Sequence, residues 1–205
     1  MDRRRTERLS QRGLQFGSPR AFRADGKYEK SVDRTRFLEM IQHRTARVAI
    51  TASTTRGQGA RGVVESARTF ASTLELSRFG TSDEHAFRRQ LDAVTWRFRR
   101  CLPKPAASWG LARKLLNIFL RDSMYTSYLA RQHDLNSAER FFEIPLDSIT
   151  AKQIRKAVPE LPSWRGVKYL DPNTSAAYQA AALFVARQHG IARVHLDAYW
   201  WGSRD

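Results

Sequence analysis

The sequence predicts an all-α protein, a compact bundle of seven or eight helices. Apolar residues recur at three- and four-residue steps along successive segments, as they do on one face of a helix. No segment shows the sustained apolar-polar alternation between turn residues that a β-hairpin needs. With 41% hydrophobic residues, 11 Phe, 5 Trp and 6 Tyr, the 205-residue chain can bury a core, which excludes wholesale disorder.

The first 30 residues differ from the rest because they combine Arg, Ser, Gly and Pro with few aliphatic residues. We therefore expect a basic flexible arm over residues 1–30 and a single helical domain over residues 31–205. Five arginines lie among residues 3–12. They suit contacts with DNA phosphates or the minor groove, but an unstructured solubilising tail would look the same, and both interpretations stay open.

Helical periodicity begins with a predicted helix over Asp33–Arg47. The small polar stretch Ser53–Gly59 predicts a loop, and a second helix follows from about Val63. Asp83 is a typical N-cap for a third helix. We expect that helix to stop before Pro103, because the residue preceding a proline disfavours the helical conformation.

The longest periodic segment, Trp109–Leu129, has a wide apolar stripe and predicts the central core helix. Gly190 is a typical residue to end a later helix, because it tolerates a left-handed conformation. The predicted helices after the central one are a short helix capped by Asp147-Ser148 or Thr150 and reaching Val158, a helix from Asp171-Pro172 to Gly190, and an aromatic-rich helix over Val194–Trp201.

The net charge of +16 points to nucleic acid as a partner. Of the 36 basic residues 29 are arginine, whose planar guanidinium suits phosphate, and the excess is spread along the chain. Arginine-rich codon usage, a ribosome-like role or a membrane-surface role would also give a basic chain. Charge alone therefore favours a nucleic-acid-binding protein without excluding these alternatives.

Several classes of protein are not expected. Cys101 is the only cysteine, which excludes a disulfide framework, and the five histidines lack metal-site spacing. We expect neither a metal nor a cofactor, since a phosphate-binding glycine loop is also missing. The longest apolar run, Ala180–Ala186, is too short to span a membrane, and the charged N-terminus leads to no apolar signal region. We expect a soluble, cytoplasmic monomer.

The C-terminal stretch 190–201 contains the most suggestive residue, Asp197, which lies among apolar and aromatic side chains. Burying an unpaired carboxylate is unfavourable, so such a residue commonly has a partner or a catalytic task. The alternative is that Asp197 only caps the last helix, since Asp is among the best N-caps.

Around this aspartate, residues 159–201 resemble the end of helix-hairpin-helix DNA glycosylases, in which a hairpin contacts DNA phosphates and a catalytic Asp begins the next helix. The segment Val194-His195-Leu196-Asp197-Ala198-Tyr199 resembles the one that carries that Asp. Two further phrases, Ser-Thr-Thr-Arg-Gly-Gln-Gly at 53–59 and Trp-Gly-Leu-Ala-Arg-Lys-Leu-Leu-Asn at 109–117, are similar to those of bacterial anti-phage glycosylases. That resemblance implies excision of glucosylated hydroxymethylcytosine from double-stranded phage DNA.

The resemblance implies that Asp197 is the catalytic carboxylate, which would stabilise the oxocarbenium-like sugar when the glycosidic bond breaks. At the hairpin position this chain has Leu-Pro-Ser-Trp-Arg-Gly over Leu161–Gly166, whereas the family has Leu-Pro-Gly-hydrophobic-Gly. Lys168 is the nearest lysine for a Schiff base. It lies 29 residues before Asp197, longer than the common spacing, which favours a monofunctional enzyme without a lyase step.

Basic and polar residues near these motifs are candidate contacts for DNA or an extruded base. Arg56 and Gln58 lie in the predicted loop over 53–59, where backbone amides also suit a phosphate. On the predicted central helix, residues at four-residue steps are expected to share one face, which would be either a grip on the base or a solvated polar stripe. These residues are Arg113, Asn117 and Arg121, with Lys114 adjacent.

Aromatic residues are the candidate walls of a pocket for an extruded base, with burial in the core as the alternative. These aromatic candidates are Trp109, Tyr125, Tyr199, Trp200 and Trp201, and the remaining candidate DNA contacts are Gly166, Arg193 and His195. Two rival functions stay open: a non-catalytic DNA-binding protein, and a toxin-like or RNA-processing nuclease.

Overall fold

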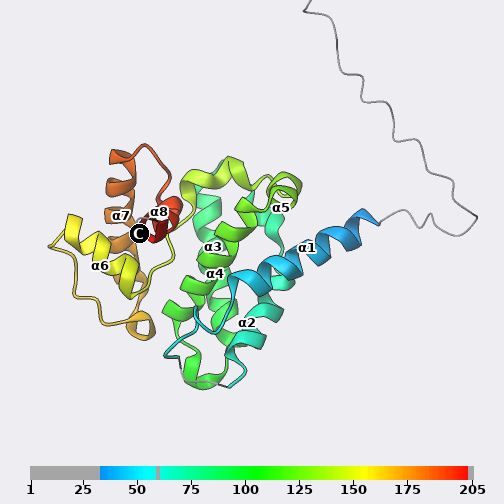
Figure 1. Cartoon of the computed structure of the whole chain (residues 1–205), viewed down its shortest axis with the longest axis horizontal. Coiled ribbons are helices and arrows are strands. Elements are labelled where there is room, and N and C mark those ends of the chain that lie inside the picture. Colours follow the sequence, from blue (N-terminus) through cyan, green and yellow to red (C-terminus); the bar gives the residue numbers. More distant parts are fainter. Residues whose placement is uncertain (1–32, 59–60, 203–205) are drawn as a thin grey trace, which may run out of the picture. The chain divides into compact units, whose positions relative to one another are not determined.

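The structure is a computed structural model that describes residues 33–58 and 61–202. The predicted arm over residues 1–30 lies outside the described residues. Within the described ranges the chain is helical and contains no strand, which confirms the all-α prediction (Figure 1). None of these helices is long and apolar enough to cross a membrane. The α-helices are α1 (Arg34–Ala49), α2 (Val63–Ser72), α3 (Glu84–Cys101), α4 (Trp109–Tyr125), α5 (Ser127–Gln132), α6 (Ser148–Ala157), α7 (Pro172–Gln188) and α8 (Leu196–Gly202).

Side-chain caps explain where several helices begin. Asp83 accepts hydrogen bonds from the backbone N–H groups of His85 and Ala86 and caps α3. Asp147 forms a capping box with Thr150 at the start of α6, and Asp171 caps α7 ahead of Pro172. The predicted starts at Asp83, Asp147 and Asp171 are therefore confirmed.

The predicted central helix is divided in the structure. It ends as α4 at Tyr125, Thr126 adopts an extended conformation, and α5 begins at Ser127. The Thr126 hydroxyl donates to the carbonyl of Asp122 at 2.8 Å, a local hydrogen bond of the kind that bends helices. Because α5 still buries Leu129, the apolar spacing continues across the break and concealed it in the sequence.

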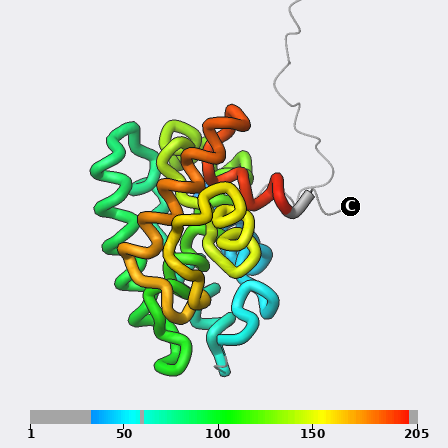
Figure 2. The backbone as a smooth tube through the Cα atoms, turned by 90° about the vertical axis from the view of Figure 1, so that its left-hand side faces the viewer, coloured from blue at the N-terminus to red at the C-terminus, as the bar shows by residue number. Residues whose placement is uncertain are grey.

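The core has two parts that meet at α4. The larger part surrounds Leu111, Leu115 and Phe119 of α4 and includes residues of α1, α2 and α3. The smaller part packs α6 against α7, whose backbone tubes (yellow and orange) lie side by side in Figure 2, and contains Tyr178 and Trp109. α4 therefore contributes to both parts, with Trp109 in the smaller one.

A close backbone approach explains the glycine next to Trp109. A Cβ at Gly110 would lie 2.1 Å from the carbonyl oxygen of Val167 and 2.6 Å from Cβ of Leu170. Only glycine lets the start of α4 touch the turn over Val167–Tyr169. This contact fixes the segment between α6 and α7 beside the candidate site.

Candidate functional site

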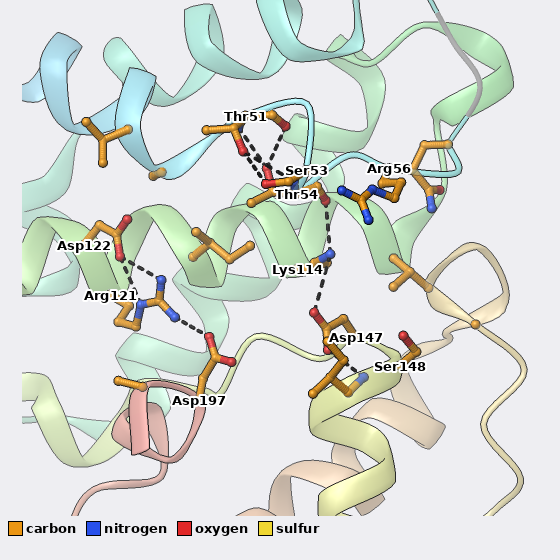
Figure 3. Close-up of a pocket in the computed structure, with 18 of the residues that line it drawn as sticks. Thr51, Ser53, Thr54, Arg56, Lys114, Arg121, Asp122, Asp147, Ser148 and Asp197 are labelled. Atoms are coloured by element: carbon orange, nitrogen blue, oxygen red, sulfur yellow. Dashed lines mark hydrogen bonds and ion pairs between the residues drawn. The ribbon is translucent and has the colours of Figure 1, made fainter. Parts of the chain in front are cut away.

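A cavity of about 840 Å³ lies beside α4 (Figure 3). Its walls come from the end of α1, the loop after α1, one face of α4, the start of α6, the segment before α7 and the first turn of α8. The polar residues that line it are Thr51, Ser53, Thr54, Arg56, Gln58, Lys114, Arg121, Asp122, Asp147, Ser148 and Asp197. Segments distant in the sequence therefore meet here.

Asp197 lies in the first turn of α8 and is buried, with its carboxylate paired to the guanidinium of Arg121 (Figure 3). The preceding residue, Leu196, is already helical, so Asp197 does not occupy the N-cap position that the alternative interpretation requires. Burial raises the pKa of Asp197 above 3.8, Arg121 opposes this rise, and the nearby charge of Asp147 adds to it.

Arg121 holds that carboxylate because its own position is fixed. Its guanidinium contacts Oδ1 of Asp122 at 2.9–3.0 Å while another nitrogen pairs with Asp197. Two carboxylates from different elements thus share one arginine. The contact with Arg121 stabilises the ionised form of Asp197 and opposes the effect of burial, although the pKa of Asp197 is still raised overall.

Lys114 occupies the same face of α4, about two turns before Arg121. Its ammonium donates to the carbonyl oxygen of Thr54 at 3.0 Å and lies 3.9 Å from Oδ2 of Asp147. Burial lowers the pKa of Lys114, while the charges of Asp147 and Asp197 oppose that shift. The cavity therefore contains a desolvated amine beside the Asp147 carboxylate.

The loop after α1 is organised by its own hydroxyl groups. Thr54 accepts from the backbone N–H of Thr51 at 2.9 Å, and the Thr51 and Ser53 hydroxyls are 2.8 Å apart. Arg68 of α2 donates to the carbonyl of Ile50 at 2.8 Å and ties the loop to the core. Gly57 has φ of +76°, a conformation that favours glycine. The hydroxyl groups, Arg56 and Gln58 are thereby presented to the cavity.

Asp147 and Trp164 line the cavity, although neither was predicted from the sequence to belong to the site. Oδ1 of Asp147 caps α6, as predicted, while Oδ2 faces Lys114. Trp164 packs edge-on against Tyr178, with ring centroids 5.6 Å apart, and supplies an aromatic side chain to the lining. The sequence pattern predicted Asp147 only as a cap, which accounts for one of its two carboxylate oxygens. Trp164 lies alone in a turn segment, where no apolar periodicity indicates its surroundings.

Three predicted contacts on α4, namely Trp109, Arg113 and Asn117, lie outside the lining of this cavity. Arg113 is buried and donates to both carboxylate oxygens of Glu143 at 2.9 and 3.1 Å, and to the hydroxyl of Thr95 at 2.8 Å. Asn117 donates to the same glutamate at 3.1 Å. Each step of four residues turns about 40° around a helix, so Arg121 is displaced by about 80° from Arg113. Trp109 lies under this network, 5.2 Å from the Arg113 guanidinium.

The remaining predicted residues are placed as follows. Arg193 is buried and donates to the carbonyls of Phe141 and Phe142 at 3.0 Å, which anchors the chain just before Asp197. His195 bridges Tyr125 and Glu139 at 2.7 and 2.8 Å.

Gly166 lines the cavity, whereas the exposed Lys168 does not. Tyr199 is half-exposed near His189, and Trp200 packs on the smaller core. The side chain of Trp201 lies outside the described residues.

The structure thus brings together seven of the predicted site residues, namely Arg56, Gln58, Lys114, Arg121, Tyr125, Gly166 and Asp197. Within residues 33–58 and 61–202, no group of three His, Cys, Asp or Glu side chains is placed to hold a metal ion. Comparisons with protein-family models, curated proteins and solved structures found no match. The site is therefore interpreted from its own chemistry.

Proposed function

We propose that the protein is a DNA glycosylase that hydrolyses the N-glycosidic bond of a modified base and leaves an abasic site. One observation carries this proposal: a buried carboxylate, Asp197, is held by Arg121 at the wall of a polar cavity in a chain of charge +16. The charge supports binding to the phosphate backbone, and the cavity supports binding of an extruded base.

The proposed chemistry needs a fixed negative charge close to the sugar. As the bond to the base breaks, positive charge develops on C1′ and the ring oxygen of the deoxyribose. The Asp197 carboxylate stabilises this charge and accepts one proton from the water whose oxygen bonds to C1′. The bond to the base breaks with its electron pair on the base, which takes one proton from solvent, and Asp197 then releases its proton to solvent. Arg121 keeps the carboxylate oriented before the reaction, which avoids reorganisation in the transition state.

The cavity also supports the finer proposal that the base carries a polar substituent. At about 840 Å³ it lies in the upper part of the range common for small-molecule sites. Hydroxyl groups of Thr51, Ser53 and Ser148 line it together with the Asp147 carboxylate and the Lys114 ammonium. Such donors and acceptors suit a hydroxyl-rich group, as in the glucosylated hydroxymethylcytosine that the sequence resemblance implies.

We further propose that the enzyme is monofunctional. Lys168, the residue that the resemblance offers for a Schiff base, is exposed and lies outside the cavity lining. Lys114 does line the cavity, but its ammonium donates to the Thr54 carbonyl and lies 3.9 Å from Asp147. With both lysines so placed, borohydride should not trap the wild-type protein on DNA. Strand breaks should appear only after alkali or a separate endonuclease acts on the abasic sites.

The decisive experiment measures base release and strand integrity on the same DNA. Phage genomic DNA with modified cytosines and a plain duplex are incubated with the wild-type protein, and released bases are identified by mass spectrometry. We expect one modified base in solution and alkali-labile intact strands. When Asp197→Asn is tested in the same assay, Asp134→Asn is its matched control. Asp134 is exposed and its φ of +50° suits asparagine.

Two results would contradict the proposal. Direct strand scission without a free base would identify a nuclease, and tight binding with neither product would identify a non-catalytic DNA-binding protein.

A further inference from the structure

The last residue of α4, Tyr125, forms part of a ridge between two cavities. Besides the 840 Å³ cavity, a second cavity of about 310 Å³ is lined by α1 and the end of α4. Val48, Asp122 and Tyr125 line both, so they separate the two spaces. Val48 is 66% exposed and Tyr125 is 50% exposed. Two exposed side chains with apolar surface, Val48 and Tyr125, therefore border the candidate site.

The ring of Tyr125 is held in place although half of it is exposed. Its hydroxyl is 2.7 Å from Nδ1 of His195, and the two rings are nearly parallel, with an interplanar angle of 9°. Nε2 of His195 lies 2.8 Å from a carboxylate oxygen of Glu139. Two other segments thus fix the orientation of this aromatic ring, and little conformational freedom is left to lose on binding.

Extruding a nucleotide leaves a gap in the duplex, and the neighbouring bases lose a stacking partner. Proteins that distort DNA commonly fill such gaps with an apolar or aromatic side chain. Tyr125 has the required position, since it borders the cavity that would receive the extruded base. Arg44 lines the second cavity on the other side of the ridge and supplies positive charge for a flanking phosphate.

We propose that the Tyr125 ring enters the DNA stack beside the extruded nucleotide and stacks on the neighbouring base. This inference rests on the proposed function, because it assumes that a base leaves the duplex. Three other tyrosines of the described residues are comparably exposed, namely Tyr128, Tyr169 and Tyr199, but none of them lines the cavity. Tyr128 packs edge-on against Phe37 instead.

The test uses a duplex that already contains the gap. One strand carries a single tetrahydrofuran abasic-site analogue flanked by 2-aminopurine, which fluoresces strongly only when it is unstacked. Saturating wild-type protein should quench this fluorescence by stacking. Tyr125→Ala should lose the quenching and bind this duplex about tenfold or more weakly, as expected when one base-aromatic contact is removed. Its affinity for an undamaged duplex should change much less.

Two variants separate stacking from a general loss of structure. Tyr128→Ala removes an equally exposed ring three residues away and should quench and bind like the wild type. Tyr125→Phe keeps the ring but loses the hydroxyl contact with His195, so quenching should be retained. Thermal melts of all variants should agree, because Tyr125 and Tyr128 lie at the surface.

The outcomes also separate this inference from the proposed function, because neither fluorescence nor binding depends on base release. Equal quenching by Tyr125→Ala and the wild type, or no quenching by the wild type, would overturn the stacking role even if base release is observed. Loss of quenching in Tyr125→Ala with retention in Tyr128→Ala would support it, even if no excised base had yet been identified.

Discussion

The two sides of α4 carry the same types of polar residue in different surroundings: one side is enclosed by other side chains, and the other borders the cavity. On one side Arg113 and Asn117 are enclosed by Glu143 and Thr95 and have direct partners. On the other side Lys114 and Arg121 border an 840 Å³ cavity, and the nearest carboxylate to the Lys114 ammonium is 3.9 Å away. Saturated polar groups stabilise a fold, whereas groups with spare bonding capacity beside open space are available to a ligand.

Changing the carboxylate on the enclosed side should have the largest effect on stability. Glu143→Gln keeps the shape of the side chain but removes the charge that Arg113 contacts with two nitrogens. Arg113 keeps a contact with the exposed Asp92 at 2.9 Å, so it is not left without a partner. We therefore expect the free energy of unfolding to fall by about 1.5–3 kcal/mol, as for the loss of hydrogen bonds to a charged group. Chemical denaturation measures this loss, and base release per folded molecule should stay close to that of the wild type. A stable but inactive variant would contradict the separation of the two sides.

The equivalent change on the cavity side, Asp197→Asn, should affect the reaction instead. Removing one preorganised electrostatic group typically lowers turnover about 10²- to 10³-fold, which corresponds to about 2.7–4 kcal/mol in the activation barrier. The melting temperature should be unchanged or raised, because the ionised Asp197 is disfavoured by burial and Arg121 retains Asp122. DNA affinity should be preserved, since the lost interaction belongs to the transition state. Full excision by this variant would eliminate Asp197 as the catalytic residue.

The pH dependence sharpens the same contrast. Since the pKa of Asp197 is raised above 3.8, its charge and the base-release rate should fall as pH decreases through that raised value. Stability should move in the opposite direction: the contribution of Asp197 is fully present below its unfolded-state pKa and is lost as pH rises through the folded-state pKa. Rates and thermal melts across acidic pH measure both. The residual activity of Asp197→Asn should lack this acid limb.

A smaller effect is expected from a pair of lysine variants. Lys114→Met removes a desolvated ammonium from the cavity and should lower base release about tenfold or more, as for the loss of a charge-assisted hydrogen bond. Stability should not suffer, since burial disfavours the charged amine. Lys168→Met makes the same change at an exposed position outside the cavity and should alter stability by about 0.5 kcal/mol or less. Single-turnover rates compare the two, and equal losses would contradict the assigned cavity face.

The local structure of this protein could largely be predicted from its sequence. Apolar spacing predicted helices over the segments that became α1, α2, α3 and α4, and the caps at Asp83, Asp147 and Asp171 were found as predicted. Such features depend on residues within a few positions of one another. Asp197 also stood out, because a carboxylate among aromatic residues is conspicuous without knowledge of its surroundings.

The pairing of residues across the chain was decided only by the tertiary structure. Arg121 and Asp197 are 76 residues apart, and nothing in either segment indicates the other. Arg113 and Lys114 are adjacent cations, and packing around α4 buries the first against Glu143 and turns the second toward the cavity. The sequence determined which segments are helical because backbone and capping preferences act locally. Which polar side chains became structural and which border the cavity depended on how helices distant in the chain pack against one another.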